Sequence, residues 1–113
     1  MRGLAIAGVL VGVLALVLGG CGESLLKAAE RGDVRTVTAL LEGGADPSMK
    51  GPEGRTPLHL AAKAGHLDVV QELLRQNARA FVKDDRGKTP LHLAAGANHQ
   101  DIVRLLSQAQ SMQ

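Results

Sequence analysis

A seven-residue sequence, Thr-Pro-Leu-His-Leu-Ala-Ala, occurs twice in this chain of 113 residues, at positions 56–62 and 89–95. The two copies begin 33 residues apart. Self-similarity at a fixed period of about 20–50 residues is typical of proteins built from one small unit that is repeated and stacked. A unit of this size cannot bury its apolar face alone, so the repeat predicts an array in which neighbouring units cover one another.

A shift of 33 residues aligns three segments of the chain without a gap. Residues 25–29 lack the full motif but fall on residues 58–62 and 91–95. Apolar residues that recur at fixed places predict the buried stripe of amphipathic helices, and paired alanines allow helices to approach closely. The positions with the same residue in all three segments are Leu25, Leu58 and Leu91; Val37, Val70 and Val103; Leu40, Leu73 and Leu106; and the alanine pairs at 28–29, 61–62 and 94–95.

Helix boundaries follow from residues with special backbone preferences. Thr56 and Thr89 are suitable N-caps, because each is followed by a proline at the first helical position. A residue with a left-handed backbone is expected just after a helix, and glycine or asparagine is the usual residue there. In the alignment, Gly32 and Gly65 coincide with Asn98, and Gly44 coincides with Asn77. The sequence therefore predicts first helices at about 24–31, 57–64 and 90–97, and second helices at about 34–42, 67–76 and 100–108.

The period, the motif and these helix ends resemble the ankyrin repeat. The resemblance implies an all-α solenoid of three stacked helix–turn–helix repeats, at about 24–50, 51–83 and 84–113. Two extended loops, residues 43–55 and 77–88, would form the fingers of the array. The outer repeats resemble caps, since Glu23-Ser24-Leu25-Leu26 replaces the first motif and Ser107 replaces Leu41 and Leu74 of the earlier repeats.

The same resemblance implies a monomeric, non-catalytic module that binds another protein through the fingers and the groove beside the first helices. The candidate contact residues are Pro52, Glu53, Arg55, Lys63, Phe81, Asp85, Arg86 and Lys88, with Ala64, Gly96 and Ala97 at further exposed positions. The four cations Arg55, Lys63, Arg86 and Lys88 give this side a modest positive bias. It is either a solvated face of mixed charge or a patch for an acidic partner or anionic lipid.

Phe81 is the only aromatic residue of the chain and aligns with Ser48. Two interpretations remain open from the sequence. The ring packs on a leucine or valine of the adjacent finger, or it is an exposed anchor for a partner, since aromatic residues are enriched among binding hot spots.

The first 20 residues predict an export signal. Arg2 precedes an uncharged apolar stretch from Leu4 to Leu18, and Leu18-Gly19-Gly20-Cys21 resembles the bacterial lipobox. By this resemblance residues 1–20 are a lipoprotein signal peptide, Cys21 is lipidated, and residues 21–23 are a short tether before a domain at 24–113. Gly22, rather than Asp, after the cysteine indicates the outer membrane of the bacterial envelope, facing the periplasm.

Three alternatives accompany this interpretation. The segment is an ordinary cleaved signal peptide, or an uncleaved membrane helix over residues 3–20, which at 18 residues is short for a span of about 20. An uncleaved helix would give the protein cytosolic partners. A structural or assembly role in the envelope is the other alternative to partner binding.

Several other functions find no support in the sequence. Without Arg2, 12 basic and 11 acidic residues remain, so no basic surface is expected for nucleic acid. The single cysteine allows no internal disulfide. The four histidines, His59, His66, His92 and His99, repeat with the array and are expected to be structural, pointing in parallel rather than converging on a metal. No catalytic constellation is recognisable, so we expect no enzyme activity and no cofactor.

Overall fold

The computed structural model describes residues 21–112 of the chain, and the side chains of residues 25–109. This part of the chain contains helices and no strand. The helices are α2 (Cys21–Arg31), α3 (Val34–Glu42), α4 (Pro57–Ala64), α5 (Leu67–Arg75), α6 (Pro90–Gly96) and α7 (Gln100–Met112), with a short 3-10 helix η1 (Pro52–Gly54). The predicted all-α fold is confirmed.

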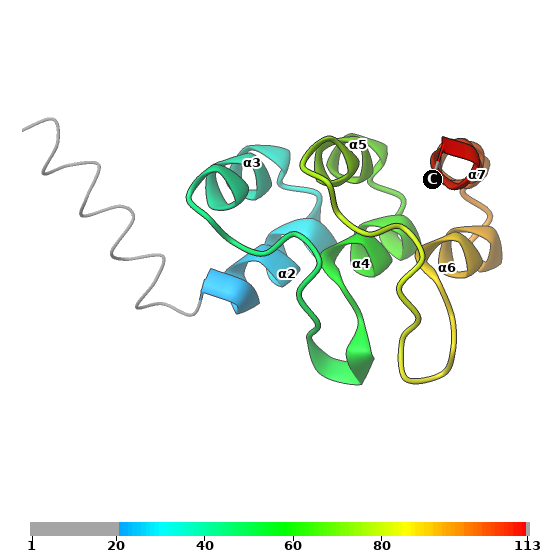
Figure 1. The fold of residues 1–113 in the computed structure, drawn as a ribbon, viewed down its shortest axis with the longest axis horizontal. Helices are drawn as coiled ribbons and strands as arrows, with labels where there is room; N and C mark the ends of the chain where they lie inside the picture. The colour runs from blue at the N-terminus through cyan, green and yellow to red at the C-terminus, as the bar shows by residue number, and fades with distance from the viewer. Residues whose placement is uncertain (1–20, 113) are drawn as a thin grey trace, which may run out of the picture.

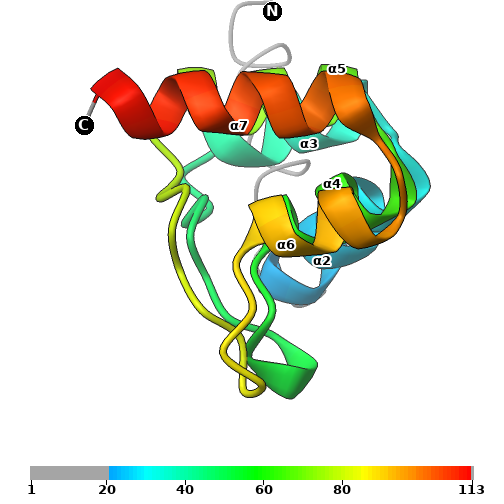
Figure 2. The same cartoon turned by 90° about the vertical axis from the view of Figure 1, so that its right-hand side faces the viewer.

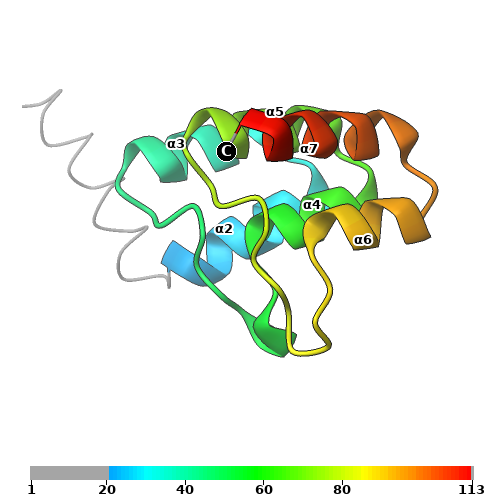
Figure 3. The same ribbon diagram turned by 45° about the vertical axis from the view of Figure 1, so that its right-hand side comes forward.

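The helices form two layers. The first helices of the repeats, α2, α4 and α6, lie side by side in one layer, and the second helices, α3, α5 and α7, form the other (Figures 1 and 3). The two long loops, residues 43–55 and 77–88, leave the second layer and project beyond the first (Figure 2). We call them the first and second finger. This is the predicted stack of three repeats, with the fingers on one side.

The core is made of the columns that the 33-residue alignment identifies. Leu25, Leu58, Val37, Val70 and Leu73 have no exposed surface, and Leu40 and Leu106 are almost as deeply buried. The last repeat differs on its outer side. Leu91 and Val103 are half-buried and Ala95 is exposed, although their counterparts Leu58, Val70 and Ala62 in the middle repeat are fully buried. The middle repeat therefore owes much of its burial to the repeat that follows it.

Each threonine–histidine pair of the motif forms a capping box. The Thr56 hydroxyl accepts the His59 backbone N–H at 3.3 Å, and His59 Nδ1 accepts the Thr56 backbone N–H at 3.1 Å. Thr89 and His92 repeat this arrangement at the start of α6. Two N–H groups at the helix start are thereby satisfied. The threonine caps were predicted, whereas the part played by the histidines was not.

The other two histidines connect neighbouring repeats. His66 Nε2–H donates to the Glu30 carbonyl at the end of α2 at 3.0 Å, and His99 Nε2–H donates to the Lys63 carbonyl at 3.2 Å. Each ring lies over a glycine of the preceding repeat, so a Cβ at Gly32 would come within 2.5 Å of His66 Nδ1.

This contact explains where the alignment keeps glycine. Gly32 and Gly65 are both left-handed, with φ of +80° and +87°, and both are covered by a histidine of the next repeat. Asn98 has the same left-handed backbone, with φ of +66°. Asparagine is the usual non-glycine residue in this backbone conformation.

The helix boundaries differ from the prediction at a few places. α2 begins at Cys21 rather than residue 24, so residues 21–23 form a helical turn and not an extended tether. α7 continues four residues beyond the predicted end at 108, because no glycine or proline interrupts it, and α5 and α6 each end one residue early.

The predicted signal segment, residues 1–20, lies outside the described residues. Within residues 21–112, no helix has the length and apolarity needed to cross a bilayer.

His59 is the polar residue buried most deeply in the array, with no exposed surface. Its Nε2–H donates to the Lys88 carbonyl in the second finger at 2.8 Å. Burial lowers the pKa of His59 below its ordinary 6.5, against smaller opposing contributions from the Lys88 carbonyl and the Asp84 charge. The fold thus favours the neutral ring, whose Nδ1 must remain unprotonated to accept the Thr56 N–H.

We expect Leu73→Ala to lower the free energy of unfolding by about 2–5 kcal/mol, because Leu73 is fully buried and the smaller side chain leaves a cavity. In so short an array this loss should act on the whole domain. Leu74→Ala is the matched control, since Leu74 is only half-buried. Urea unfolding of both variants tests this, and a cost for Leu73→Ala no greater than that of Leu74→Ala would contradict the expected shared core.

A second prediction concerns pH. The neutral His59 ring stabilises the fold fully above about pH 6.5, and this contribution is lost as the pH falls through the lowered pKa of the folded state. His59→Gln should cost about 1–3 kcal/mol at neutral pH by disturbing buried hydrogen bonds. It should also flatten the decline in stability between about pH 7.5 and 5.5.

His92→Gln is the control for the pH prediction, since His92 makes the same capping box but is exposed. Urea midpoints measured across this pH range should decline for the wild type and His92→Gln alike. An equally steep decline in His59→Gln would show that another group causes it.

Candidate functional site

Two hydrogen bonds donated by backbone N–H groups of the second finger join the two fingers. The Arg79 N–H donates to Ser48 Oγ at 2.8 Å near the base, and the Asp85 N–H donates to the Glu53 carbonyl at 2.9 Å near the tip. Glu53 lies in η1 with a left-handed φ of +63°, a conformation that the sequence did not indicate for a non-glycine residue. The first finger is therefore held in one conformation by the second.

A buried carboxylate organises the second finger. Asp84 Oδ1 accepts the backbone N–H groups of Arg86 and Lys88 at 2.9 and 2.8 Å. These hydrogen bonds, that of Lys88 first, keep the pKa of Asp84 below its ordinary value. The other oxygen, Oδ2, lies 3.5 Å from Arg55 Nε of the first finger. The Asp84 charge thus fixes the turn of its own finger and attracts the neighbouring one.

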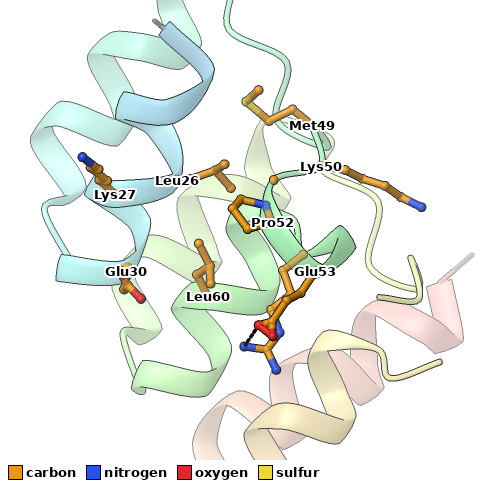
Figure 4. Close-up of a pocket in the computed structure, with 10 residues that line it drawn as sticks. Leu26, Lys27, Glu30, Met49, Lys50, Pro52, Glu53 and Leu60 are labelled. Atoms are coloured by element: carbon orange, nitrogen blue, oxygen red, sulfur yellow. Dashed lines mark ion pairs between the residues drawn. The ribbon is translucent and has the colours of Figure 1, made fainter. Parts of the chain in front are cut away.

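A groove of about 700 Å³ lies between α2, the first finger and α4. We call it the first-finger groove. The side chains of Leu26, Pro52 and Leu60 converge on it, and Met49 lies at one end (Figure 4). Its rim carries both charges, and its remaining lining residues are Lys27, Glu30, Lys50, Gly51, Glu53 and Arg55.

The apolar character of this groove comes from two linked substitutions in the repeat. Leu26 occupies the alignment position of His59, and Gly51 occupies that of Asp84. The imidazole and the carboxylate are replaced together, and a Cβ at Gly51 would come within 2.3 Å of Leu26 Cδ1. The polar contacts of His59 and Asp84 thus hold the second finger. At the same positions of the preceding repeat, Leu26 packs against Gly51 of the first finger.

Six of the predicted contact residues have the expected exposure. They are Pro52, Glu53, Lys63, Asp85, Arg86 and Lys88. Pro52 and Glu53 lie together on the groove, while Asp85, Arg86 and Lys88 lie on the second finger, and Lys63 lies on α4. Whether these residues contact a partner stays a prediction.

The other two predicted contact residues are less accessible than expected. The side chain of Arg55 is only 15% exposed, because it lies between Glu53 and the buried Asp84. Phe81 is half-buried and packs against the hydrophobic core. Of the two interpretations of Phe81, the structure favours packing over a fully exposed anchor.

Sequence reasoning missed the apolar floor of the groove, formed by Leu26, Met49 and Leu60. One signal was available, since Leu26 stands where the other repeats have the motif histidine. Chemically, the groove can receive an apolar side chain and pair its flanking residues with charges on the rim. Across the described residues, no group of three or more histidine, cysteine or acidic side chains is placed to hold a metal ion.

Comparison with known proteins agrees with this architecture. The family model described as "Ankyrin repeats (3 copies)" matches residues 25–112. No curated protein shows significant similarity to the chain. The matched region contains both fingers and all of the helices except the first four residues of α2, and the chain therefore belongs to the ankyrin-repeat family.

Proposed function

We propose that this protein binds a partner protein by taking one of its apolar side chains into the first-finger groove. Ankyrin repeats indicate a protein–protein interaction module. The single observation that carries the proposal is the open apolar lining of the groove, formed by Leu26, Met49, Pro52 and Leu60. A solvent-accessible apolar surface surrounded by charged residues is the usual composition of a binding hot spot and its rim. We propose no catalytic activity for it.

The charged rim would select among partners. Each wall of the groove carries both charges, since Lys27 and Glu30 are exposed on α2, and Lys50 and Glu53 are exposed on the first finger. A partner segment with an apolar residue between a basic and an acidic one complements this arrangement. Charges at a rim contribute more to partner selection and to association rates than to affinity.

We further propose that the domain is attached to a bacterial envelope membrane through a lipid on Cys21, facing the periplasm. This rests on the sequence of residues 1–21, which resembles a lipoprotein signal. Because α2 begins at Cys21, only one helical turn, about 5 Å, would separate the lipid from the packed repeat. The array would then lie close to the bilayer as a monomer. A structural role in the envelope, or an uncleaved segment with cytosolic partners, are the competing proposals.

The groove proposal is tested by placing a charge on its floor. Leu60→Glu should weaken recovery of partners from native envelope extract by about tenfold or more, because a buried charge is costly in a binding site. Ala39→Glu is the control, since Ala39 is exposed on α3, away from the groove. Both variants should keep helical circular dichroism.

Equal recovery of the same proteins by wild type and a folded Leu60→Glu would reject the groove as the binding surface. The triple variant Lys63→Ala/Arg86→Ala/Lys88→Ala separates a second possibility. If only this variant loses binding, the exposed cations rather than the groove contact the partner.

The membrane proposal predicts a mature protein that begins at acylated Cys21. Mass spectrometry of the protein purified from membranes should show the loss of residues 1–20 and the added mass of a diacylglyceryl group and an amide-linked acyl chain. The Cys21→Ser variant should lack this added lipid mass. A membrane-bound product that retains Met1 would contradict lipidation and favour an uncleaved helix.

A further inference from the structure

A second apolar crevice lies on the opposite layer of the array, away from the fingertips. It has a volume of about 480 Å³ and lies between α5, the turn after it, and α7. These two helices are neighbours in the second layer (Figures 1 and 3). Its apolar surface comes from Leu74, Ala78, Leu105 and Ala109. It shares no lining residue with the first-finger groove.

The crevice differs from the equivalent seam between α3 and α5. There, three polar side chains at the end of α5 and its C-cap form a bonded cluster: Arg75 donates to both Glu72 oxygens, at 3.1 and 2.7 Å, and Gln76 donates to Glu72 at 3.1 Å. These hydrogen bonds, that of Arg75 first, lower the pKa of Glu72, with a smaller contribution from Thr38 of α3. A bonded cluster of polar side chains therefore occupies the α5 side of that seam.

One repeat later, the three positions of this cluster are occupied by Leu105, Gln108 and Ala109. Neither apolar residue can take part in such a polar cluster, and α5 packs less extensively on α7 than on α3. Leu74 is half-buried in consequence, whereas its counterpart Leu41 is only 7% exposed. Leu105 and Ala109 therefore leave an accessible apolar surface at the positions where the preceding repeat has a hydrogen-bonded polar cluster.

The charges around the crevice are of one sign. Its described lining contains Arg75 and Arg79 and no carboxylate. Glu72 already neutralises Arg75. Arg79 is exposed and its guanidinium makes no ion pair or hydrogen bond with any described residue, Asp46 of the adjoining hollow included. Among the described residues, the Arg79 charge at the edge of the open apolar surface therefore has no opposite charge paired with it.

We propose that the α5–α7 crevice is a second docking site, which binds an aliphatic side chain next to a carboxylate in a protein partner. The apolar pocket accepts the aliphatic group, and the Arg79 guanidinium pairs with the carboxylate. A protein segment fits the position better than a bilayer does. The crevice lies at the end of the array opposite to α2, and thus far from Cys21, where a lipid anchor would be (Figure 1).

A labelled octapeptide with a Leu-Leu-Asp-Glu centre, flanked by Gly-Ser at both ends, tests the site by fluorescence anisotropy. The full chain is used in phosphatidylcholine nanodiscs. We expect saturable binding that Arg79→Glu weakens by about tenfold, the value of one good charged contact. Leu105→Gln should weaken it similarly, and a Leu-Leu-Lys-Lys peptide should bind at least tenfold less well.

Two controls separate this site from the rest of the molecule. Arg35→Glu removes an exposed cation of α3 and should leave binding unchanged. Leu60→Glu disables the first-finger groove but not the crevice. Unchanged peptide binding in this variant therefore assigns the peptide to the crevice, and this result does not depend on whether the groove itself binds a partner. The proposal is overturned by absent binding, by equal binding of the lysine peptide, by binding that only Leu60→Glu abolishes, or by Arg79-dependent binding to phosphatidylglycerol vesicles without peptide binding.

Discussion

The burial of each helical pair by its neighbours is the interaction on which the rest of this structure depends. Leu58, Ala62 and Val70 of the middle repeat have no exposed surface, whereas Leu91, Ala95 and Val103 at the same places of the last repeat are partly or fully exposed. The chemistry of the side chains is nearly the same, so the difference lies in the presence of a following repeat. Stability in this domain therefore resides in contacts between repeats as much as within them.

Polar contacts determine how the repeats are aligned. A histidine at the start of a second helix bonds to the end of the preceding first helix, and it lies over a glycine that leaves room for it. His59 and Asp84 do the same for the fingers by fixing the second finger against α4 and against Arg55. Where these polar residues are replaced, at Leu26 and Gly51, the array has an apolar groove instead. The groove that we propose as a binding surface thus lies where the repeat departs from its own pattern.

The sequence was sufficient to predict the fold because the same choices recur at a fixed period. The apolar columns, the threonine caps and the left-handed glycines and asparagines all predicted features that the structure contains. The larger errors in helix boundaries are the start of α2 and the end of α7, whereas α5 and α6 each differ by one residue. No glycine or proline follows Leu106 to stop α7.

The candidate sites were less predictable than the fold, for a physical reason. The partial burial of Arg55 depends on Asp84, which is 29 positions away, and nothing local to Arg55 indicates it. The floor of the groove combines α2, a finger and α4, so Leu26 and Leu60 become neighbours only after stacking. The α5–α7 crevice likewise arises because Leu105 and Ala109 cannot form the hydrogen bonds that Glu72 and Gln76 form at the same positions of the preceding repeat. Such sites are visible only when equivalent positions of neighbouring repeats are compared in space.

Native-state hydrogen exchange of the full chain tests the central claim most directly. If each repeat depends on its neighbours, the slowest backbone amides of α2, α4 and α6 should exchange with the same free energy of opening, equal to that of global unfolding. A first or last repeat whose slowest amides open at a much lower free energy, while α4 and α5 stay protected, would contradict the account.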